Sequence, residues 1–299
     1  MKKQLTICSL IKNNEDIVPL VSFIEKGVVL VGTNNPDAYK KSGIIFKSIN
    51  NEDLSAAKNE LLKHVDTPWV MFIEPWERLI TDIPDLTNIE KKSYSLQVVN
   101  NGIITKSIRI WPIERNLKFF NPIYETVEDK NAGFVETILY SEKAPKIDNE
   151  VQIIEAWKKQ KPTSPTPVYY EAYMYLAEMN YDKFLNSANA YLFMEKTGLT
   201  ATMMRYYMAM VHLYVKNDIF KSGSLLSHCL ISNPLMAEFW CLMGDILYHS
   251  KKYDKAIAMY ENAKIMGSQR LKSDPWPIHV VKYLEYPDKM IKNCAELLN

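Results

Sequence analysis

The sequence predicts two domains of different class, an α/β domain followed by an all-α domain built from repeated helix pairs. Three observations lead to this prediction. Short apolar runs between residues 5 and 73 each end in a polar turn, as the strands of a covered parallel sheet do. A helical pattern at 54–62 separates two of these runs. In the second half, large and small side chains recur at helical spacing with a constant period.

Length and composition set the limits of the prediction. A chain of 299 residues is long enough for two domains, and a hydrophobic content of 47% excludes a disordered chain. The net charge of +1 gives no large field that would attract nucleic acid or anionic lipid, although binding to nucleic acid stays open. We expect an α/β domain at 1–143, a proline-rich linker at 144–168, and a helical domain with a C-terminal cap at 169–299.

The four cysteines predict a reducing compartment. They are far apart except for one pair, and none forms a C-x-x-C motif, so buried free thiols are expected. The segment Met1 to Leu10 is too polar for a signal peptide, and no apolar run reaches the roughly 20 residues of a membrane helix. We therefore expect a soluble, cytoplasmic protein.

The first elements predict a βαβ unit. Leu5 to Ile11 is an apolar, β-branched strand that ends at the polar residues 12–16. A short helix follows, and Gly27 opens a second strand that ends at Gly32 before the turn residues 33–37. Both polar loops can also be plain surface turns, with no functional role.

The stretch from Asn51 to Leu79 contains the helix and the most buried strand of the first domain. After a third strand at Ile44–Ser48, helical spacing is followed by the apolar run Trp69–Ile73. Glu74 and Glu77 come directly after that run. Ligands of open α/β sheets bind where strands end, so these acids predict a binding crevice.

Later segments predict a hairpin and a linker. Ser93–Val99 and Ile103–Ile110 alternate in polarity on either side of Asn101-Gly102, which is a strong hairpin signal. Between residues 144 and 168 the density of prolines predicts a linker with one helix at Glu150–Gln160.

The first half resembles the family-two glycosyltransferases, which have the GT-A fold, a Rossmann-like mixed sheet. The run D-L-S-A-A-K-N at 53–59 is similar to that family's D-F-S-A-A-R-N, and it is followed by a strand and an acidic turn at 74–77. The loop Lys12-Asn13-Asn14-Glu15 is similar to the family's K-N-E-E. Thr33 and Asp37 match its next loop, and the segment from Arg109 to Tyr124-Glu125 is similar to a late family segment.

This resemblance implies an enzyme that transfers a sugar from a nucleotide-diphosphate donor to a protein, peptide, glycan or modified nucleic-acid base. Its site would include a Mn²⁺ or Mg²⁺ ion that neutralises the diphosphate. The implied roles are metal or diphosphate binding by Glu74, catalysis by Glu125 as general base and by Glu77, and substrate binding by Lys12, Asn13, Thr33, Asp37, Asp53, Lys58, Trp76, Arg109 and Tyr124.

Departures from the family pattern keep an alternative open, a non-catalytic binding or scaffold protein. Gly32 stands where an acid usually holds the nucleotide base, and Glu74-Pro75-Trp76-Glu77 replaces D-A-D-E. Trp76 cannot ligate a metal, so the ion is held by fewer groups, or is not needed, or catalysis is lost. Trp76 would then stack on a ring or close the crevice, and Glu125 would form a salt bridge at the sheet edge.

The second half resembles the tetratricopeptide repeat. Trp240, Gly244, Ala256 and Tyr260 match its pattern of large and small positions, and a step of 34 residues back leads to Tyr206, Met210, Ser222 and Leu226. A shortened copy is expected at Tyr170–Asn180 and Lys183–Phe193. Repeats of this kind present a groove, so a protein or peptide held by the helices is the partner that they imply.

Overall fold

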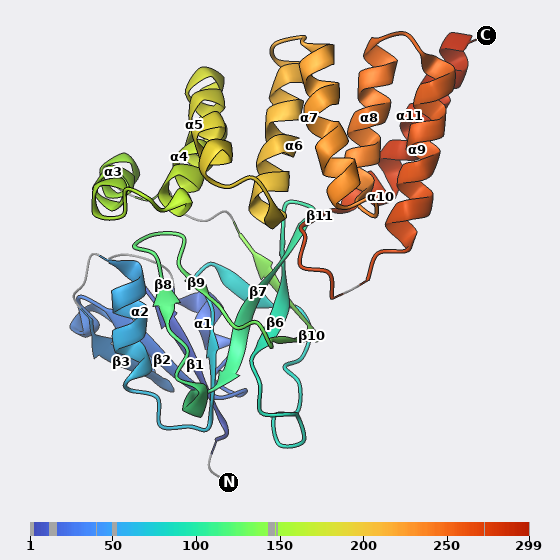
Figure 1. Ribbon diagram of the computed structural model, residues 1–299. Helices are drawn as coiled ribbons and strands as arrows, with labels where there is room; N and C mark the ends of the chain where they lie inside the picture. Colours follow the sequence, from blue (N-terminus) through green and yellow to red (C-terminus); the bar gives the residue numbers. More distant parts are fainter. Residues whose placement is uncertain are drawn as a thin grey trace. The chain divides into compact units, whose positions relative to one another are not determined.

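The computed structural model describes residues 3–11, 17–39, 41–49, 53–142, 147, 149–271 and 273–298. The chain divides into two compact units at 1–148 and 149–299 (Figure 1), which we name the sheet unit and the helical unit. The boundary lies inside the predicted linker.

The sheet unit is built on a mixed sheet with the strand order β3-β2-β1-β4-β7-β6-β10-β5. The first four strands of this order are parallel, and Ile7 of β1 is level with Val29 of β2 and Met71 of β4. Strand β7 is antiparallel to β4 and to β6, and β10 is parallel to β6. The bounds are β1 Leu5–Leu10, β2 Val28–Thr33, β3 Ile44–Ser48, β4 Trp69–Phe72, β5 Glu77–Leu79, β6 Tyr94–Asn100, β7 Ile103–Pro112 and β10 Gly133–Ser141.

Both faces of the parallel strands are covered, which explains why their sequences are continuously apolar. On one face, alternate strand residues pack with Leu20 of α1 (Val18–Val21) and with Phe23. On the other face, the strands pack with Leu61 of α2 (Leu54–Leu62) and with Phe119 of β8 (Phe119–Phe120). Helix α2 and the strands before and after it are therefore confirmed.

The predicted hairpin is also confirmed. Strands β6 and β7 pair in antiparallel register and are joined by Asn101 and Gly102, whose φ angles of 46° and 75° suit a tight hairpin turn. Strand β8 pairs with β9 (Thr126–Val127) in a separate two-stranded sheet, and two 3₁₀ turns lie at Pro36–Ala38 and Ile113–Arg115.

The helical unit consists of antiparallel helix pairs. The pairs α4/α5, α6/α7 and α8/α9 pack internally and in sequence order (Figure 1). Helix α3 precedes them, and α11 packs on α9. The bounds are α3 Glu150–Gln160, α4 Pro165–Ala177, α5 Tyr181–Met194, α6 Gly198–Tyr214, α7 Ile219–Ser232, α8 Ala237–His249, α9 Tyr253–Ser268, β11 Ile278–His279, α10 Val280–Tyr283 and α11 Glu285–Leu298.

Small residues lie where the helices of a pair approach each other. A Cβ atom on Gly244 would lie 2.5 Å from the ring of Tyr260, so α8 and α9 can pack this closely only with glycine there. One repeat earlier, the buried Ser222 of α7 donates a hydrogen bond of 2.8 Å to the carbonyl oxygen of Ala209 on α6. The predicted repeat pattern of residues 206–263 is thus confirmed by the packing.

The predicted linker is largely helical. Helix α3 has the predicted bounds, but α4 already begins at Pro165, inside the segment expected to connect the domains. Pro165 and Pro167 occupy the first turn of α4, where a missing N–H disrupts no helical hydrogen bond. Ser164 caps this turn by accepting a hydrogen bond from the N–H of Thr166 at 3.4 Å.

Two further features bear on the expected environment. All four cysteines are buried free thiols, as predicted. In the described part of the chain, none of the helices has the length and apolar character needed to cross a lipid bilayer.

Candidate functional site

The predicted acids do meet at the end of β4, but as part of a buried ion-pair network. Its members are Lys58 of α2, Glu74 after β4, Glu77 of β5, Arg109 of β7, and Glu125 before β9. Three carboxylates and two cations thus come from segments that are distant in sequence. We call this group the five-residue ion network.

Lys58 is the cation at its centre. The Nζ atom lies 2.6 Å from Oε1 of Glu74 and 3.1 Å from Oε1 of Glu125. The ammonium also lies 5.0 Å and 5.2 Å from the ring centroids of Phe72 and Phe119, within the range of cation–π attraction. Only 3% of the lysine side chain is exposed, so these contacts replace its hydration.

Arg109 holds the other side of the network. One terminal nitrogen donates to Oε1 of Glu77 at 2.8 Å, and the other lies 3.6 Å from Oε1 of Glu74. Its Nε donates to the hydroxyl of Ser107 at 2.9 Å. The second oxygen of Glu77 accepts the backbone N–H of Glu74 at 2.8 Å, so the acidic turn is closed by its own hydrogen bond.

The network shifts the pKa values of Glu74 and Glu77 in opposite directions. Burial would raise the pKa of Glu74, but the Lys58 and Arg109 charges outweigh burial and lower this pKa. Burial dominates for Glu77 and, together with the neighbouring Glu74 charge, raises its pKa despite Arg109. Burial would also lower the pKa of Lys58, but Glu74 and Glu125 raise it, so the lysine stays charged.

These residues do not fit a divalent cation. An ammonium and a guanidinium both lie next to Oε1 of Glu74, and their positive charges would repel a divalent ion. Glu77 is 2% exposed and begins β5, which pairs with Ser141 of β10, so the acidic turn forms no open loop. Among the described residues, His, Cys, Asp and Glu form no group of three that could hold a metal ion.

The remaining predicted residues lie apart from one another or have local roles. Asp53 caps α2 by accepting hydrogen bonds from the N–H of Ala56 at 2.9 Å and from the Ser55 hydroxyl at 2.8 Å. Thr33 is buried at the end of β2, and Asp37 lies in the 3₁₀ turn that follows. Lys12 and Asn13 lie outside the described residues.

Two predicted substrate-binding residues lie in turns. The carbonyl oxygen of Trp76 accepts the N–H of Glu142 at 3.1 Å, so the backbone of the acidic turn is tied to the end of β10. Tyr124 has a φ angle of 52°, an uncommon conformation for a bulky residue, next to Glu125 of the ion network. Both roles in substrate binding remain predictions.

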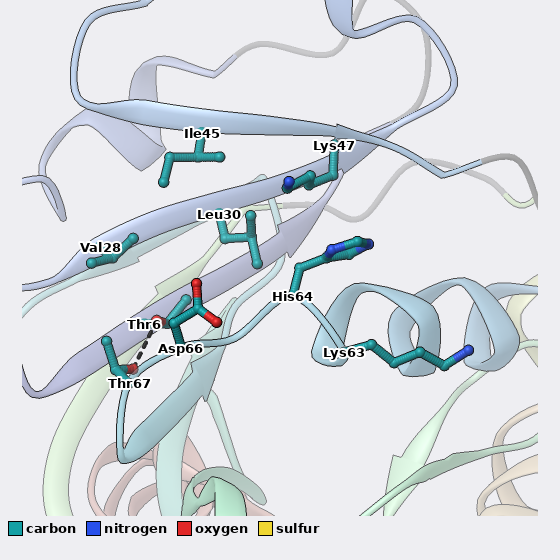
Figure 2. A pocket seen from close by; sticks show the side chains of 9 residues that line it. All are labelled: Thr6, Val28, Leu30, Ile45, Lys47, Lys63, His64, Asp66 and Thr67. Carbon is teal, nitrogen blue, oxygen red and sulfur yellow. Dashed lines mark hydrogen bonds between the residues drawn. The ribbon is translucent and has the colours of Figure 1, made fainter.

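A cavity in the sheet unit lies on the face of β1, β2 and β3 beyond the end of α2. Its volume is about 350 Å³, and its apolar lining consists of Val28, Leu30 and Ile45. Figure 2 shows Lys47 and His64 near one end and Asp66 near Thr6 and Thr67, whose hydroxyls are 2.8 Å apart. The lining thus contains both basic and acidic side chains.

The helical unit carries a row of partly exposed aromatic rings on the first helices of its pairs. The rings of Tyr173 on α4 and Tyr207 on α6 are 6.3 Å apart. Tyr214 lies two turns after Tyr207, on the same side of α6, and its ring is 6.2 Å from His249 of α8. Tyr173 and Tyr214 are 41% and 48% exposed. We call Tyr173, Tyr207, Tyr214 and His249 the aromatic face.

Two buried acids of α8 were missed in the sequence analysis. Asp245 accepts hydrogen bonds from the hydroxyls of Tyr214 at 2.5 Å, Tyr260 at 2.7 Å and Tyr286 at 2.6 Å. Glu238 accepts from the N–H of His279 and from the hydroxyl of Tyr283, both at 2.7 Å. The available signal was a pair of acids seven residues apart within an otherwise apolar helix, which places both on one side of α8.

Comparison with known proteins gives weak likenesses for the helical half. No family model and no curated protein matches the chain. MamA from Desulfovibrio magneticus RS-1 is 16% identical with a TM-score of 0.39, over 50% of this chain and 79% of that one. The first TPR domain of human RPAP3 is 10% identical with a TM-score of 0.36, over 46% and 94%. The Sgt2 TPR domain from Aspergillus fumigatus is 10% identical with a TM-score of 0.36, over 45% and 78%.

The predicted membership of family-two glycosyltransferases is wrong. With it fall the GT-A part of the fold class and the enzyme assignment: the similar solved structures are helical-repeat proteins, and no family model matches the chain. The predicted nucleotide-sugar donor is left without support. The physical reason is the ion network, because Glu74, Glu77 and Glu125 are engaged by Lys58 and Arg109. The D-L-S-A-A-K-N run serves to cap α2 and to place Lys58 in this network.

Proposed function

We propose that the protein is a non-catalytic binding protein whose helical unit holds a segment of a protein partner. The aromatic face is the observation that carries this proposal. Tyr173, Tyr207, Tyr214 and His249 come from three successive first helices, so an extended or helical segment could contact all three. Tyrosine is favoured at binding surfaces because its ring is large and rigid and its hydroxyl is polar.

The aromatic face is preorganised. The hydroxyl of Tyr214 is held by Asp245 at 2.5 Å, and the ring of Tyr173 packs between those of Tyr169 and Tyr207, with centroid distances of 6.5 Å and 6.3 Å. A partner therefore has little side-chain entropy to remove on binding, which favours affinity. The buried free thiols support a cytoplasmic location as part of the same proposal.

Peptide display on the full chain tests this proposal. Peptides enriched on the wild-type protein should bind Tyr173→Ala about tenfold more weakly or worse, because truncation of a central aromatic side chain typically costs this much. Phe220→Ala is the matched control, since Phe220 is 87% exposed on α7, a second helix, outside the aromatic face. Equal affinities for wild type, Tyr173→Ala and Phe220→Ala would contradict the proposal, as would a failure to enrich any peptide.

A further inference from the structure

The helical unit has a second feature that the aromatic face does not include, a cavity of about 490 Å³ at the start of α6. The connection between α5 and α6, the end of α7 and the segment after α9 form its walls. Its lining consists of Lys196, Thr197, Gly198, Leu199, Thr202, Arg205, His228, Ile231, Ser232 and Trp276. We call it the basic cavity.

The charge of the basic cavity is one-sided. Lys196, Arg205 and His228 are basic, and none of its lining residues is acidic. None of the three forms an ion pair with a described residue, and Lys196 and His228 are exposed while Arg205 is half-buried. The guanidinium of Arg205 donates one hydrogen bond, at 2.7 Å to the carbonyl oxygen of Lys196, which fixes it beside the entry to α6.

The backbone adds to this positive field. Helix α6 has 17 residues and begins at Gly198. Thr197, the N-cap residue before it, makes no side-chain capping hydrogen bond within the described chain. The amide end of such a helix carries about half a positive charge and attracts anions. Two side-chain cations, an imidazole and a helix N-terminus therefore surround one small space.

The apolar part of the lining indicates which kind of group a ligand would carry beside an anionic group. Trp276 is fixed by an edge-on contact with Phe239, with ring centroids 6.2 Å apart, and Leu199 packs in the same hydrophobic cluster. Ile231 is 82% exposed at the rim. A ligand that fills this space thus joins an anionic group to an apolar neighbour.

We propose that the basic cavity binds a phosphorylated serine or threonine of the partner segment, next to an apolar residue. A phosphoryl group carries about −1.5 to −2 charges at neutral pH and three acceptor oxygens, which matches Lys196 and Arg205 within one cavity. A single carboxylate would leave one of these cations unmatched. This proposal rests on the proposed function, because it specifies the chemistry of the same partner, and it uses different residues of the helical unit.

Fluorescence titration of the full chain with three peptide libraries tests this inference. The libraries share random flanks and carry phosphoserine, glutamate or serine at the centre, and inorganic phosphate serves as competitor. The phosphoserine library should bind about tenfold more tightly than the glutamate library, and more weakly as salt rises, because the contact is charge-assisted. Arg205→Gln and Lys196→Gln should each remove most of this preference.

Lys255→Gln is the matched control, since Lys255 is an exposed lysine of α9 outside the cavity. Because Arg205 also holds the connection before α6, unchanged thermal unfolding must be shown for its variant, and Lys196→Gln provides a second reading. Equal binding of the glutamate and phosphoserine libraries overturns the proposal in favour of a carboxylate site. Binding of inorganic phosphate without peptide preference, phosphopeptide binding that survives both variants, or no binding also overturns it.

Failure of this inference is distinguishable from failure of the proposed function. If the protein shows no preference for phosphopeptides but still binds peptides in a Tyr173-dependent way, only the phosphate site in the basic cavity is overturned. If Tyr173→Ala does not weaken peptide binding, the aromatic face is overturned as a binding surface. The effect of Arg205→Gln and Lys196→Gln on the preference for phosphopeptides can still be measured in that case.

Discussion

Buried carboxylates occur in both units, and they are stabilised by different partners. In the sheet unit, Glu74, Glu77 and Glu125 are paired with the cations Lys58 and Arg109. In the helical unit, Asp245 and Glu238 accept hydrogen bonds mainly from tyrosine hydroxyls and a backbone N–H. The ammonium of Lys282 lies 3.9 Å from Asp245, and Arg270 lies 4.0 Å from Glu238.

Because the two groups of acids are stabilised so differently, the burial of an acidic residue is weak evidence for a catalytic role. In the sheet unit, charge is balanced by charge, so removal of one member leaves an unpaired ion in a poorly solvated place. In the helical unit, neutral dipoles solvate the carboxylates, so a neutral acceptor can replace them at lower cost. Both clusters join distant segments, and this structural role accounts for them without a reaction.

The largest expected effect is the loss of the central cation of the ion network. Lys58→Met leaves Glu74 and Glu125 without their closest positive partner, and we expect the free energy of unfolding to fall by about 3–5 kcal/mol. Urea unfolding followed by circular dichroism measures this change, and hydrogen exchange assigns it to the sheet unit. Lys63→Met is the matched control, because Lys63 is 69% exposed and should contribute little. Equal losses in the two variants would show that the ion network is not a buried charge cluster.

A pair of nearly isosteric substitutions tests the comparison directly. Glu74→Gln removes a negative charge that faces two cations, and we expect it to cost about 2–3 kcal/mol. Asp245→Asn keeps one acceptor oxygen, and its amide can donate to a tyrosine hydroxyl oxygen, so we expect a loss of about 1 kcal/mol. Unfolding in urea gives both values, with Glu261→Gln on the exposed side of α9 as control. The reverse order of the two losses would refute the distinction between the clusters.

Local patterns explain how much could be predicted. The strands around Trp69, the hairpin at Asn101-Gly102, helix α3 and the 34-residue recurrence from Tyr206 to Trp240 depend on neighbours in sequence or on a constant period. These features carry their own signal. The start of α4 was missed because prolines are common both in linkers and in the first turn of a helix. Pro165 and Pro167 alone therefore do not distinguish the two.

The site could not be predicted because its meaning depends on partners that are far away in sequence. Glu74 looks like a free acid until Arg109, 35 residues later, and Lys58, 16 residues earlier, are placed beside it. In the same way, Asp245 is satisfied by Tyr214 and Tyr286, which lie 31 and 41 residues away. Short motifs record residue types at an edge of the sheet, but not whether the charges there are already paired.

The smallest expected effect is a pH dependence of opposite sign at Glu238 of the helical unit and Glu74 of the sheet unit. Burial raises the pKa of Glu238 in the folded protein, so the native state binds a proton more readily than the unfolded chain does. Stability from this residue is therefore greatest at low pH and falls as pH rises from the ordinary glutamate pKa to the raised one. Glu74 has a lowered pKa and contributes in the opposite direction, since its stability is lost as pH falls through the folded pKa.

Glu238→Gln isolates the contribution of the helical unit. The amide oxygen of glutamine can still accept the N–H of His279, while the group no longer ionises. Thermal unfolding is measured between about pH 4 and about pH 8. As pH rises, the stability of the variant should increase relative to that of the wild type and reach a plateau at higher pH. This increase should be smaller than the loss expected for Glu74→Gln or for Asp245→Asn. Glu74→Gln should show the reverse, losing further against the wild type as pH rises through the acidic range. Parallel pH profiles for the two variants would mean that charge pairing and dipolar solvation do not distinguish the units.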